Sequence, residues 1–206
     1  MKSIEIESKL ELNSEDFDKL KSSGRIKCFK DQLNIYFDSN NSLSERGITF
    51  RIRLIPGSFP VLTLKIPRSI SEESRNCIEI EKELRTDFKL SKTKKINIKK
   101  ELPNEFSELL ENLNIELLER IGYMRTHRWV AELPNGIDVE LDEVRLPTGQ
   151  KFFEVEIEND VLDQRESAIN IIRQITGFSQ PSLQSKYERF REALEILNNE
   201  KKSSFR

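Results

Sequence analysis

The sequence contains few of the residues from which proteins commonly build zinc sites, disulfide frameworks and nucleophilic catalysts. Its 206 residues include two cysteines, Cys28 and Cys77, and one histidine, His127. The cysteines lie far apart without the spacing of zinc ligands, and a single histidine excludes a metal site built from several histidines. Glycine-rich phosphate loops of the G-x-x-x-x-G-K type, H-E-x-x-H helices and G-x-S-x-G turns do not occur. None of these common site types is therefore indicated.

Long apolar runs are also missing. No run approaches the roughly 18 residues that a membrane-spanning helix needs, and the N-terminal residues do not form a signal-peptide pattern. From these absences we expect a cytoplasmic protein without a membrane partner. Neither sign of charge predominates, because 34 lysines and arginines stand against 36 aspartates and glutamates, for a formal net charge of -2. This balance argues against nucleic acid as a partner.

Charged residues are nevertheless abundant: they make up 34% of the chain, against 36% for hydrophobic residues. A chain of this length can bury a core without disulfides or metals as staples. Because the sequence has no evident linker and no repeat of fixed period, we expect one domain over residues 1–200. Residues 201–206 are expected to form a frayed or disordered tail. The oligomeric state is left open between a monomer and a homodimer.

The segment from Ser3 to Glu11 alternates apolar and charged residues. Its apolar members are Ile4, Ile6 and Leu10, and its charged members are Glu5, Glu7, Lys9 and Glu11. A period of two places the two sets on opposite faces of a β-strand. Carboxylates two positions apart point the same way, roughly 7 Å from each other, and can share a hard divalent cation. The same pattern also occurs on the solvated face of an antiparallel sheet.

Similar alternation recurs along the chain between turn signals such as Asn135-Gly136. The expected strands cover residues 27–38, 48–54, 61–66, 77–84, 123–133, 137–142 and 153–158. Helical spacing of apolar residues predicts helices that begin near Ser14, after Pro103, at Leu162 and at Ser182. The lysine-rich stretch 89–100 has no clear period and is expected to be a solvated loop or face. The fold class is therefore α+β.

On the charged faces of these strands, pairs of successive residues carry the same sign of charge. The acidic pairs are Glu5/Glu7, Glu79/Glu81, Glu140/Asp142 and Glu154/Glu156, and the basic pair is Arg51/Arg53. Like charges on one face repel, and a surface selected for solubility would more naturally mix the signs. We therefore consider a barrel with a charged, water-filled interior and helices packed outside. In such a barrel, arginine and lysine side chains bind phosphate oxygens, and carboxylates bind the cations that accompany them.

The residues Glu5-Ile6-Glu7-Ser8-Lys9 resemble the E-x-E-x-K signature of the CYTH superfamily, the triphosphate tunnel metalloenzymes. Further landmarks follow in the order of that family. They are Arg51 and Arg53 in an R-x-R strand, Lys65, Glu79 and Glu81, Arg125, Asp142, Glu154 and Glu156, and Lys186. The resemblance extends from residue 4 to about residue 190.

This resemblance implies an eight-stranded antiparallel β-barrel, a tunnel with a charged interior and with helices outside, which binds a small-molecule triphosphate. It also implies Mg²⁺ or Mn²⁺ as the cofactor. The family includes inorganic, thiamine and RNA triphosphatases as well as one class of adenylyl cyclase. The function expected here is metal-dependent hydrolysis of inorganic tripolyphosphate or of a small organic triphosphate. A class IV-type adenylyl cyclase and a non-catalytic polyphosphate- or nucleotide-binding module remain alternatives.

The resemblance also implies a role for each matching residue. The residues expected to bind the triphosphate are Lys9, Arg51, Arg53, Lys65, Arg125 and Lys186. The residues expected to bind metal are Glu5, Glu7, Asp142, Glu154 and Glu156. Glu5, Glu7, Lys9 and Glu156 are expected to be catalytic, with a carboxylate or a second ion orienting the attacking water.

Several side chains are left open. Glu79, Glu81 and Glu140 lie either in the tunnel or on the solvent side, and Lys186 is either a phosphate ligand or a surface lysine. Arg128 has the opposite strand parity to Arg125, so both face inward only if a bulge intervenes. His127 is expected to be structural, and Tyr36 and Asp38 to border the site.

Overall fold

The computed structural model describes residues 2–70, 75–85, 92–177, 180–182 and 184–204. By the density of contacts the chain divides into two units. The first unit comprises Met1–Ile4, Leu33–Arg68 and Cys77–Tyr123, and the second comprises Glu5–Gln32, Ser69–Asn76 and Met124–Arg206. Each unit is described separately below.

The strands occupy most of the positions that the alternating patterns predict. They are β1 (Lys2–Leu12), β2 (Arg25–Asp38), β3 (Thr49–Leu54), β4 (Val61–Ile70), β5 (Arg75–Glu83), β6 (Lys95–Asn97), β7 (Leu117–Glu132), β8 (Asp138–Arg145), β9 (Lys151–Glu158) and β10 (Gln180–Pro181). The helices are α1 (Ser14–Ser23), α2 (Ile98–Glu101), α3 (Asn104–Glu111), α4 (Leu162–Thr176) and α5 (Lys186–Ser204), with a short 3₁₀ turn over Ser44–Arg46.

Among the described residues, the hydrogen-bonded strand order is β10-β1-β5-β4-β3-β2-β7-β8-β9, with β6 beside β7. Strand β1 also pairs with β9, so the eight strands from β1 to β9 in this order form a closed sheet. The strand pairs whose registers are described are antiparallel. This strand order confirms the expected α+β fold with an eight-stranded antiparallel β-barrel.

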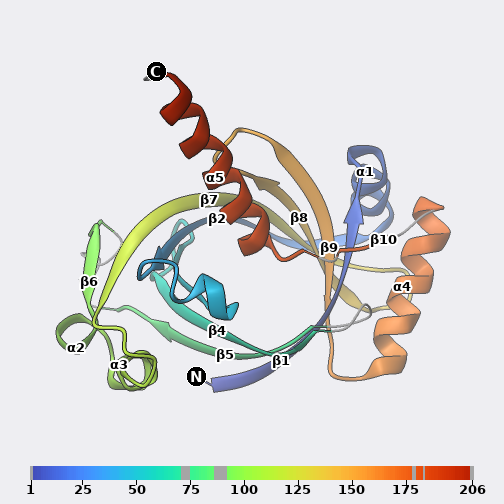
Figure 1. Cartoon of the computed structure of the whole chain (residues 1–206). Coiled ribbons are helices and arrows are strands. Elements are labelled where there is room, and N and C mark those ends of the chain that lie inside the picture. The colour runs from blue at the N-terminus through green and yellow to red at the C-terminus, as the bar shows by residue number, and fades with distance from the viewer. Residues whose placement is uncertain (1, 71–74, 86–91, 178–179, 183, 205–206) are drawn as a thin grey trace. The chain divides into compact units, whose positions relative to one another are not determined.

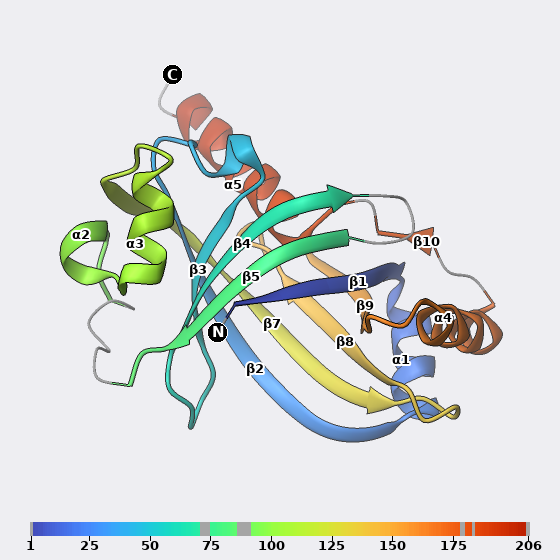
Figure 2. The same ribbon diagram turned by 90° about the horizontal axis from the view of Figure 1, so that it is seen from below.

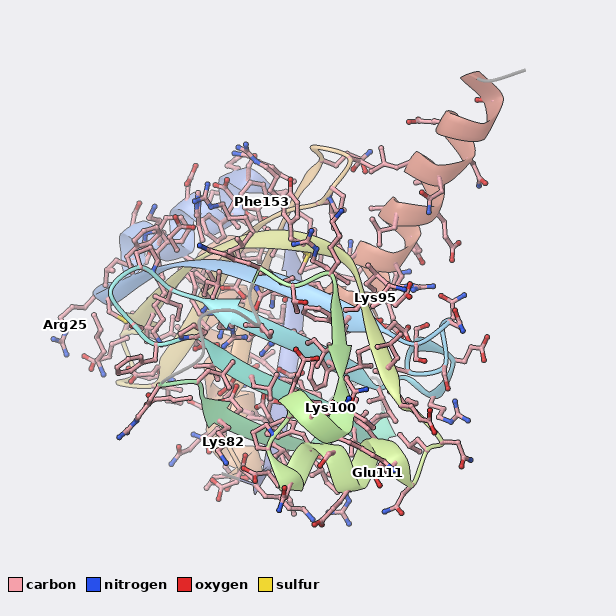
Figure 3. The ribbon with its side chains drawn as sticks, turned by 90° about the vertical axis from the view of Figure 1, so that its left-hand side faces the viewer. Arg25, Lys82, Lys95, Lys100, Glu111 and Phe153 are labelled. Carbon is pink, nitrogen blue, oxygen red and sulfur yellow. The ribbon has the colours of Figure 1, made fainter. Side chains whose placement is uncertain are left out.

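In the first unit, the apolar faces of β2, β3 and β4 pack together with helices α2 and α3. The strand registers align Ile35 with Ile52 and Phe37 with Phe50. Phe50 also contacts Phe106 of α3, with ring centroids 6.3 Å apart. The helices α2 and α3 lie together in Figure 3, where Lys100 and Glu111 mark them. The burial of this apolar face turns the charged face of the same strands away from the core.

The stretch 89–100 was expected to be a solvated loop or face: its described lysines are exposed, but the segment is not a loop throughout. Residues 89–91 lie outside the described part of the chain, but residues 95–97 form β6, and α2 follows directly. Ile96 and Ile98 are fully buried in the core of the first unit. The burial of these two isoleucines therefore packs the segment against the core, although lysines flank them in sequence.

In the second unit, helices α1 and α4 cover the apolar face of strands β1, β7, β8 and β9. The core side chains are Leu10, Leu12, Phe17, Leu20, Ala131, Leu133, Val139, Leu141, Val155, Ile157, Ala168 and Ile172. Figures 1 and 2 both show α1 and α4 side by side, in agreement with their mutual contacts. Each strand in this layer buries its apolar side beneath a helix.

Helix α1 begins and ends at the residues that the sequence indicates. The Asn13 side chain accepts a hydrogen bond from the backbone N–H of Asp16 at 2.9 Å, which caps the helix. Gly24 follows the last turn, and a β-carbon at this position would lie only 3.3 Å from the β-carbon of Ala131. The close approach to β7 therefore favours glycine.

Helix α5 begins four residues later than the predicted start at Ser182 and continues to Ser204. The tail predicted over 201–206 thus overlaps α5, and residues 205–206 lie outside the described part. The single domain over residues 1–200 stays a prediction. In the described segments, no helix combines the length and the apolar character that a membrane span requires.

Candidate functional site

The charged faces of β1, β8 and β9 bring seven carboxylates together in the second unit. We call these residues the carboxylate cluster: Glu5, Glu7, Glu140, Asp142, Glu154, Glu156 and Glu158. The strand registers explain the grouping, because Glu156 lies opposite Lys9 on one side and opposite Glu140 on the other. Asp142 likewise lies opposite Glu154. Alternation along each strand and pairing between strands are sufficient to form the cluster.

Arg128 of β7 binds three members of the carboxylate cluster. Its Nε donates to Asp142 Oδ1 at 2.8 Å and its Nη2 to Asp142 Oδ2 at 2.6 Å, which is a bidentate pair. The guanidinium also pairs with Glu156 and Glu140. Arg128 is buried. Removal of one partner would therefore leave the remaining charges unpaired in a low-dielectric environment, which is costly.

Two lysines complete the set of cationic side chains that the described ion pairs bring to the cluster. Lys9 Nζ lies 2.5 Å from Glu156 Oε1 and 3.1 Å from Glu7 Oε1. Lys186, at the first residue of α5, lies 2.8 Å from Asp142 Oδ2 and 2.7 Å from Glu156 Oε1, and it also binds Glu154. The ammonium group of Lys186 therefore lies among three carboxylates.

The environment separates the pKa values of neighbouring carboxyl groups. Burial opposes the ionisation of Glu156, but Lys186, Lys9 and Arg128 outweigh it and hold its pKa well below the ordinary value. Burial also opposes ionisation of Asp142, where Arg128 and Lys186 again lower the pKa. At Glu154 burial prevails over the attraction of Lys186 and Lys9, and the pKa is raised. The cluster thus combines firmly ionised groups with groups that hold a proton more readily, of which Glu154 is the most deeply buried.

Glu158 was not among the predicted site residues, although it continues the parity of Glu154 and Glu156 along β9. Glu158 is exposed at the surface, yet crowding by neighbouring atoms, together with repulsion from Glu140, Glu156 and Glu5, raises its pKa to about 8. Burial in the same way raises the pKa of Glu140. Burial is the first cause of both shifts, and repulsion from neighbouring carboxylates adds to it.

The donor set fits a hard divalent cation. Three groups of the cluster, Glu5/Glu7/Glu158, Glu140/Glu156/Glu158 and Asp142/Glu154/Glu156, each offer oxygen atoms within 4.8 Å of one another. If all seven carboxylates are ionised, they exceed Lys9, Arg128 and Lys186 by four negative charges. In the described part of the chain, the buried Oε2 of Glu154 has no hydrogen-bond partner. Oxygen-only donors of this kind suit Mg²⁺, Mn²⁺ or Ca²⁺.

A second polar face lies in the first unit, on strands β3, β4 and β5. Arg51 Nη2 is 3.7 Å and Lys65 Nζ 3.4 Å from Glu79 Oε1. Thr63 donates a hydrogen bond to Glu81 Oε1 at 2.9 Å. We call Arg51, Arg53, Lys65, Glu79 and Glu81 the basic face, because its three cations exceed its two carboxylates. An anionic group with several oxygens is the kind of ligand that such cations bind.

Most predicted site residues fall in these two groups. The structure brings Glu5, Glu7, Lys9, Glu140, Asp142, Glu154, Glu156 and Lys186 together in the second unit. It places Arg51, Arg53, Lys65, Glu79 and Glu81 together in the first unit. Glu79, Glu81 and Glu140, which the sequence left open, therefore lie on the polar faces together with the other predicted residues.

Arg125, which was expected to bind the triphosphate, lies outside both groups. Its side chain is 57% exposed and forms a bidentate pair with Asp31, with Nε–Oδ1 at 2.8 Å and Nη2–Oδ2 at 2.9 Å. Arg125 and Arg128 have opposite parity on the same strand, so only one of them can face the carboxylates. The structure places Arg128 against the carboxylates and Arg125 beside Asp31.

Of the three remaining residues, His127 and Asp38 belong to local structure. His127 contacts the rings of Phe29 and Trp129, with centroids 5.8 and 6.2 Å away, on the same strand face as Arg125. The buried carboxylate of Asp38 accepts hydrogen bonds from the backbone N–H groups of residues 39, 43 and 44, and so organises the loop before β3. Tyr36 is buried opposite Arg51 in the strand register.

Comparison with known proteins gives a consistent result. The CYTH domain family matches residues 3–190 of the chain. A protein from Hippeastrum, HpAC1, described as a candidate adenylyl cyclase with a dominant triphosphatase activity, is similar with a TM-score of 0.77 and 23% identity over 91% of this chain and 95% of that one. A candidate adenylate cyclase from Bacillus halodurans has a TM-score of 0.72 and 26% identity over 92% and 98% of the two chains. The PH1819 protein from Pyrococcus horikoshii has a TM-score of 0.60 and 23% identity over 91% and 98%. No curated protein matches the sequence.

Proposed function

The chain belongs to the CYTH domain family, and we propose that it is a metal-dependent triphosphatase. Its substrate is inorganic tripolyphosphate or a small organic triphosphate. The observation that carries this proposal is the carboxylate cluster, in which seven carboxylates outnumber three cationic side chains. Such an excess of carboxylates over cationic side chains favours the binding of divalent cations, and triphosphates are bound and hydrolysed with divalent cations as partners.

The proposal assigns metal binding to the carboxylate cluster. Asp142, Glu154 and Glu156 form its most deeply buried group, and the buried Oε2 of Glu154 is an available donor atom. Glu5, Glu7, Glu140 and Glu158 supply the other donor oxygens. Bound Mg²⁺ or Mn²⁺ neutralises phosphate charge and polarises phosphoryl oxygens.

Cationic side chains bind the phosphate chain in this proposal. Within the first unit we assign this role to Arg51, Arg53 and Lys65. Within the second unit we assign it to the three cations that bind the carboxylate cluster, Lys9, Arg128 and Lys186. Arginine suits it because a planar guanidinium can form two parallel hydrogen bonds with one phosphate group. The cations of the second unit already hold carboxylates, so substrate binding there requires an exchange of ion-pair partners.

The chemical step is an in-line displacement. A water oxygen forms a bond to the terminal phosphorus, the bridging P–O bond breaks, and pyrophosphate leaves when the substrate is tripolyphosphate. The water gives up a proton, and we assign its acceptance to an ionised carboxylate of the cluster. Glu156, whose pKa is strongly lowered, remains ionised and holds Lys9, Lys186 and Arg128 in place.

A substrate panel tests the proposal. Tripolyphosphate, thiamine triphosphate and ATP are incubated with the protein in Mg²⁺, in Mn²⁺ and in a chelator, and the products are identified. We expect one of them to yield orthophosphate and the corresponding diphosphate only when a divalent ion is present. The Glu156→Gln variant should lose this activity, since it removes an ionised member of the cluster.

The descriptions of two structural neighbours favour a second function. Both the Hippeastrum and the Bacillus halodurans proteins are described as candidate adenylyl cyclases. A cyclase binds the same triphosphate group but attacks the α-phosphorus with the ribose 3′-hydroxyl, releasing pyrophosphate. Formation of cyclic AMP from ATP would therefore indicate a cyclase and contradict the hydrolase proposal. Binding of tripolyphosphate without turnover in either metal would instead indicate a polyphosphate-binding module.

A further inference from the structure

The side chain of Arg53, a member of the basic face, contacts a neutral side chain of the neighbouring strand. Its Nε donates a hydrogen bond to Oδ1 of Asn34 at 3.1 Å. The two residues lie directly opposite each other in the register of β2 and β3. Both belong to the first unit, so the contact lies within one part of the chain.

Asn34 is itself almost completely buried, with 2% of its surface exposed. A buried amide group is costly unless it forms hydrogen bonds, so its orientation is fixed by its partner. The residues on either side of Asn34, Leu33 and Ile35, belong to or pack against the apolar core of the first unit. Asn34 therefore points to the polar face while its neighbours in sequence point to the core.

The nature of this contact matters for anion binding. A guanidinium group is planar, and an acceptor fixed at Nε determines the plane and the direction of the two terminal nitrogens. Those nitrogens form the edge that binds phosphate bidentately. The amide oxygen of Asn34 orients the Nε side of the Arg53 guanidinium and is itself uncharged.

We propose that Asn34 is a positioning residue that orients the Arg53 guanidinium toward a phosphate group of the substrate. The inference rests on the proposed function for the identity of the anion, but the hydrogen bond between the two side chains does not. Asn34 touches no substrate in this account, and it acts only through Arg53.

The first test needs no substrate. In the uncomplexed protein, nitrogen-edited NMR follows the Nε–H signal of Arg53, assigned by its disappearance in Arg53→Lys. We expect Asn34→Ala to accelerate the exchange of this proton with water and to shift its signal. Unchanged exchange and shift in Asn34→Ala would overturn the inference. If Asn34→Ala does not fold, Asn34→Ser serves instead, because its hydroxyl is too short to reach Nε.

The second test is a double-mutant cycle on tripolyphosphate hydrolysis. Asn34→Ala should raise KM about five- to tenfold with a smaller change in kcat, as expected for the loss of one hydrogen bond that supports binding. In an Arg53→Ala background the same change should have no further effect, since the two residues act as a unit. Equal effects of Asn34→Ala in both backgrounds would contradict a role through Arg53.

Leu33→Ala is the matched control. It alters the adjacent residue of the same strand on the core side, so it should lower the unfolding temperature and leave KM unchanged. A KM increase in Leu33→Ala equal to that in Asn34→Ala would show that general loosening of β2 causes both, and would overturn the inference.

The two proposals can fail separately. If the wild-type protein does not hydrolyse tripolyphosphate, the proposed function fails, and calorimetric binding of tripolyphosphate replaces KM in the cycle. Weaker binding in Asn34→Ala by about five- to tenfold then supports the positioning role. Equal affinity of wild-type and Asn34→Ala protein contradicts it.

Discussion

Arg128 and Arg125 lie three positions apart on β7 and have entirely different surroundings. Arg128 is buried and pairs with Asp142, Glu156 and Glu140, whereas Arg125 is exposed and pairs with Asp31. At the scale of the residue, strand parity decides which of the two can reach the carboxylates. The sequence contains this information, but the strand pattern around these residues is irregular. The family's order of landmarks therefore led to Arg125, which pairs with Asp31 and not with the cluster.

The two arginines predict contrasting mutational effects. Arg128→Lys keeps the charge but loses the bidentate geometry with Asp142, so kcat/KM for tripolyphosphate should fall by about 10- to 100-fold. Arg125→Lys is the matched control, and steady-state kinetics should show at most a twofold change, because exposed ion pairs contribute little. Equal losses in both variants, or a loss in Arg125→Lys alone, would contradict the assignment of Arg128.

Glu158 and Asn34 show what single-residue reasoning from the sequence misses. Glu158 follows the parity of its strand, and could have been included on that ground alone. Asn34 gives no such signal, since its importance depends on the residue opposite it in β3, and cross-strand partners are fixed by register rather than by local sequence.

At the scale of the element, alternation and helical spacing predicted most strands and helices. The period-two pattern located β1, β3, β8 and β9, because each has one apolar face buried under helices. The capping residue Asn13 and the stop at Gly24 located α1. The pattern failed in the lysine-rich stretch 89–100, where two buried isoleucines form a signal too short to be periodic.

That failure leads to a prediction about stability. Ile98 is fully buried in the core of the first unit, so Ile98→Ala should reduce the free energy of unfolding by about 2–5 kcal/mol. Lys95→Ala, three residues earlier on β6, removes a solvent-exposed ion pair with Glu119 and should cost at most about 1 kcal/mol. Urea denaturation measures both values. Similar small effects would mean that the segment is a solvated loop after all.

At the scale of the whole molecule, pairing order could not be read from the residues alone. Alternation assigns faces to each strand, but the pairing of β1 with both β5 and β9 joins segments far apart in sequence. That part of the fold followed from the family resemblance. The charge segregation, by contrast, was visible in the sequence, and the excess of carboxylates in the cluster is its consequence.

The excess charge predicts that divalent cations stabilise the protein. Because a ligand that binds only the folded state adds stability by mass action, Mg²⁺ or Mn²⁺ at 100 times its dissociation constant should add about 2.7 kcal/mol. Thermal unfolding with and without a chelator measures this. The Glu154→Gln variant should lose most of the gain, because it removes a buried donor from the group with Asp142 and Glu156.

Glu15→Gln is the matched control for that experiment. Its side chain is 79% exposed on α1 and does not belong to the carboxylate cluster. It should retain the full stabilisation by the metal. If Glu154→Gln and the wild-type protein gain equally from divalent ions, the ions bind elsewhere.

The most direct measurement is the release of products from tripolyphosphate by wild-type protein and by Glu156→Gln, in Mg²⁺ or Mn²⁺ and in a chelator. The account predicts equal amounts of orthophosphate and pyrophosphate, formed only with a divalent ion and only by the wild-type protein. Cleavage that continues in the chelator or in Glu156→Gln, or the absence of cleavage in both metals, would contradict it.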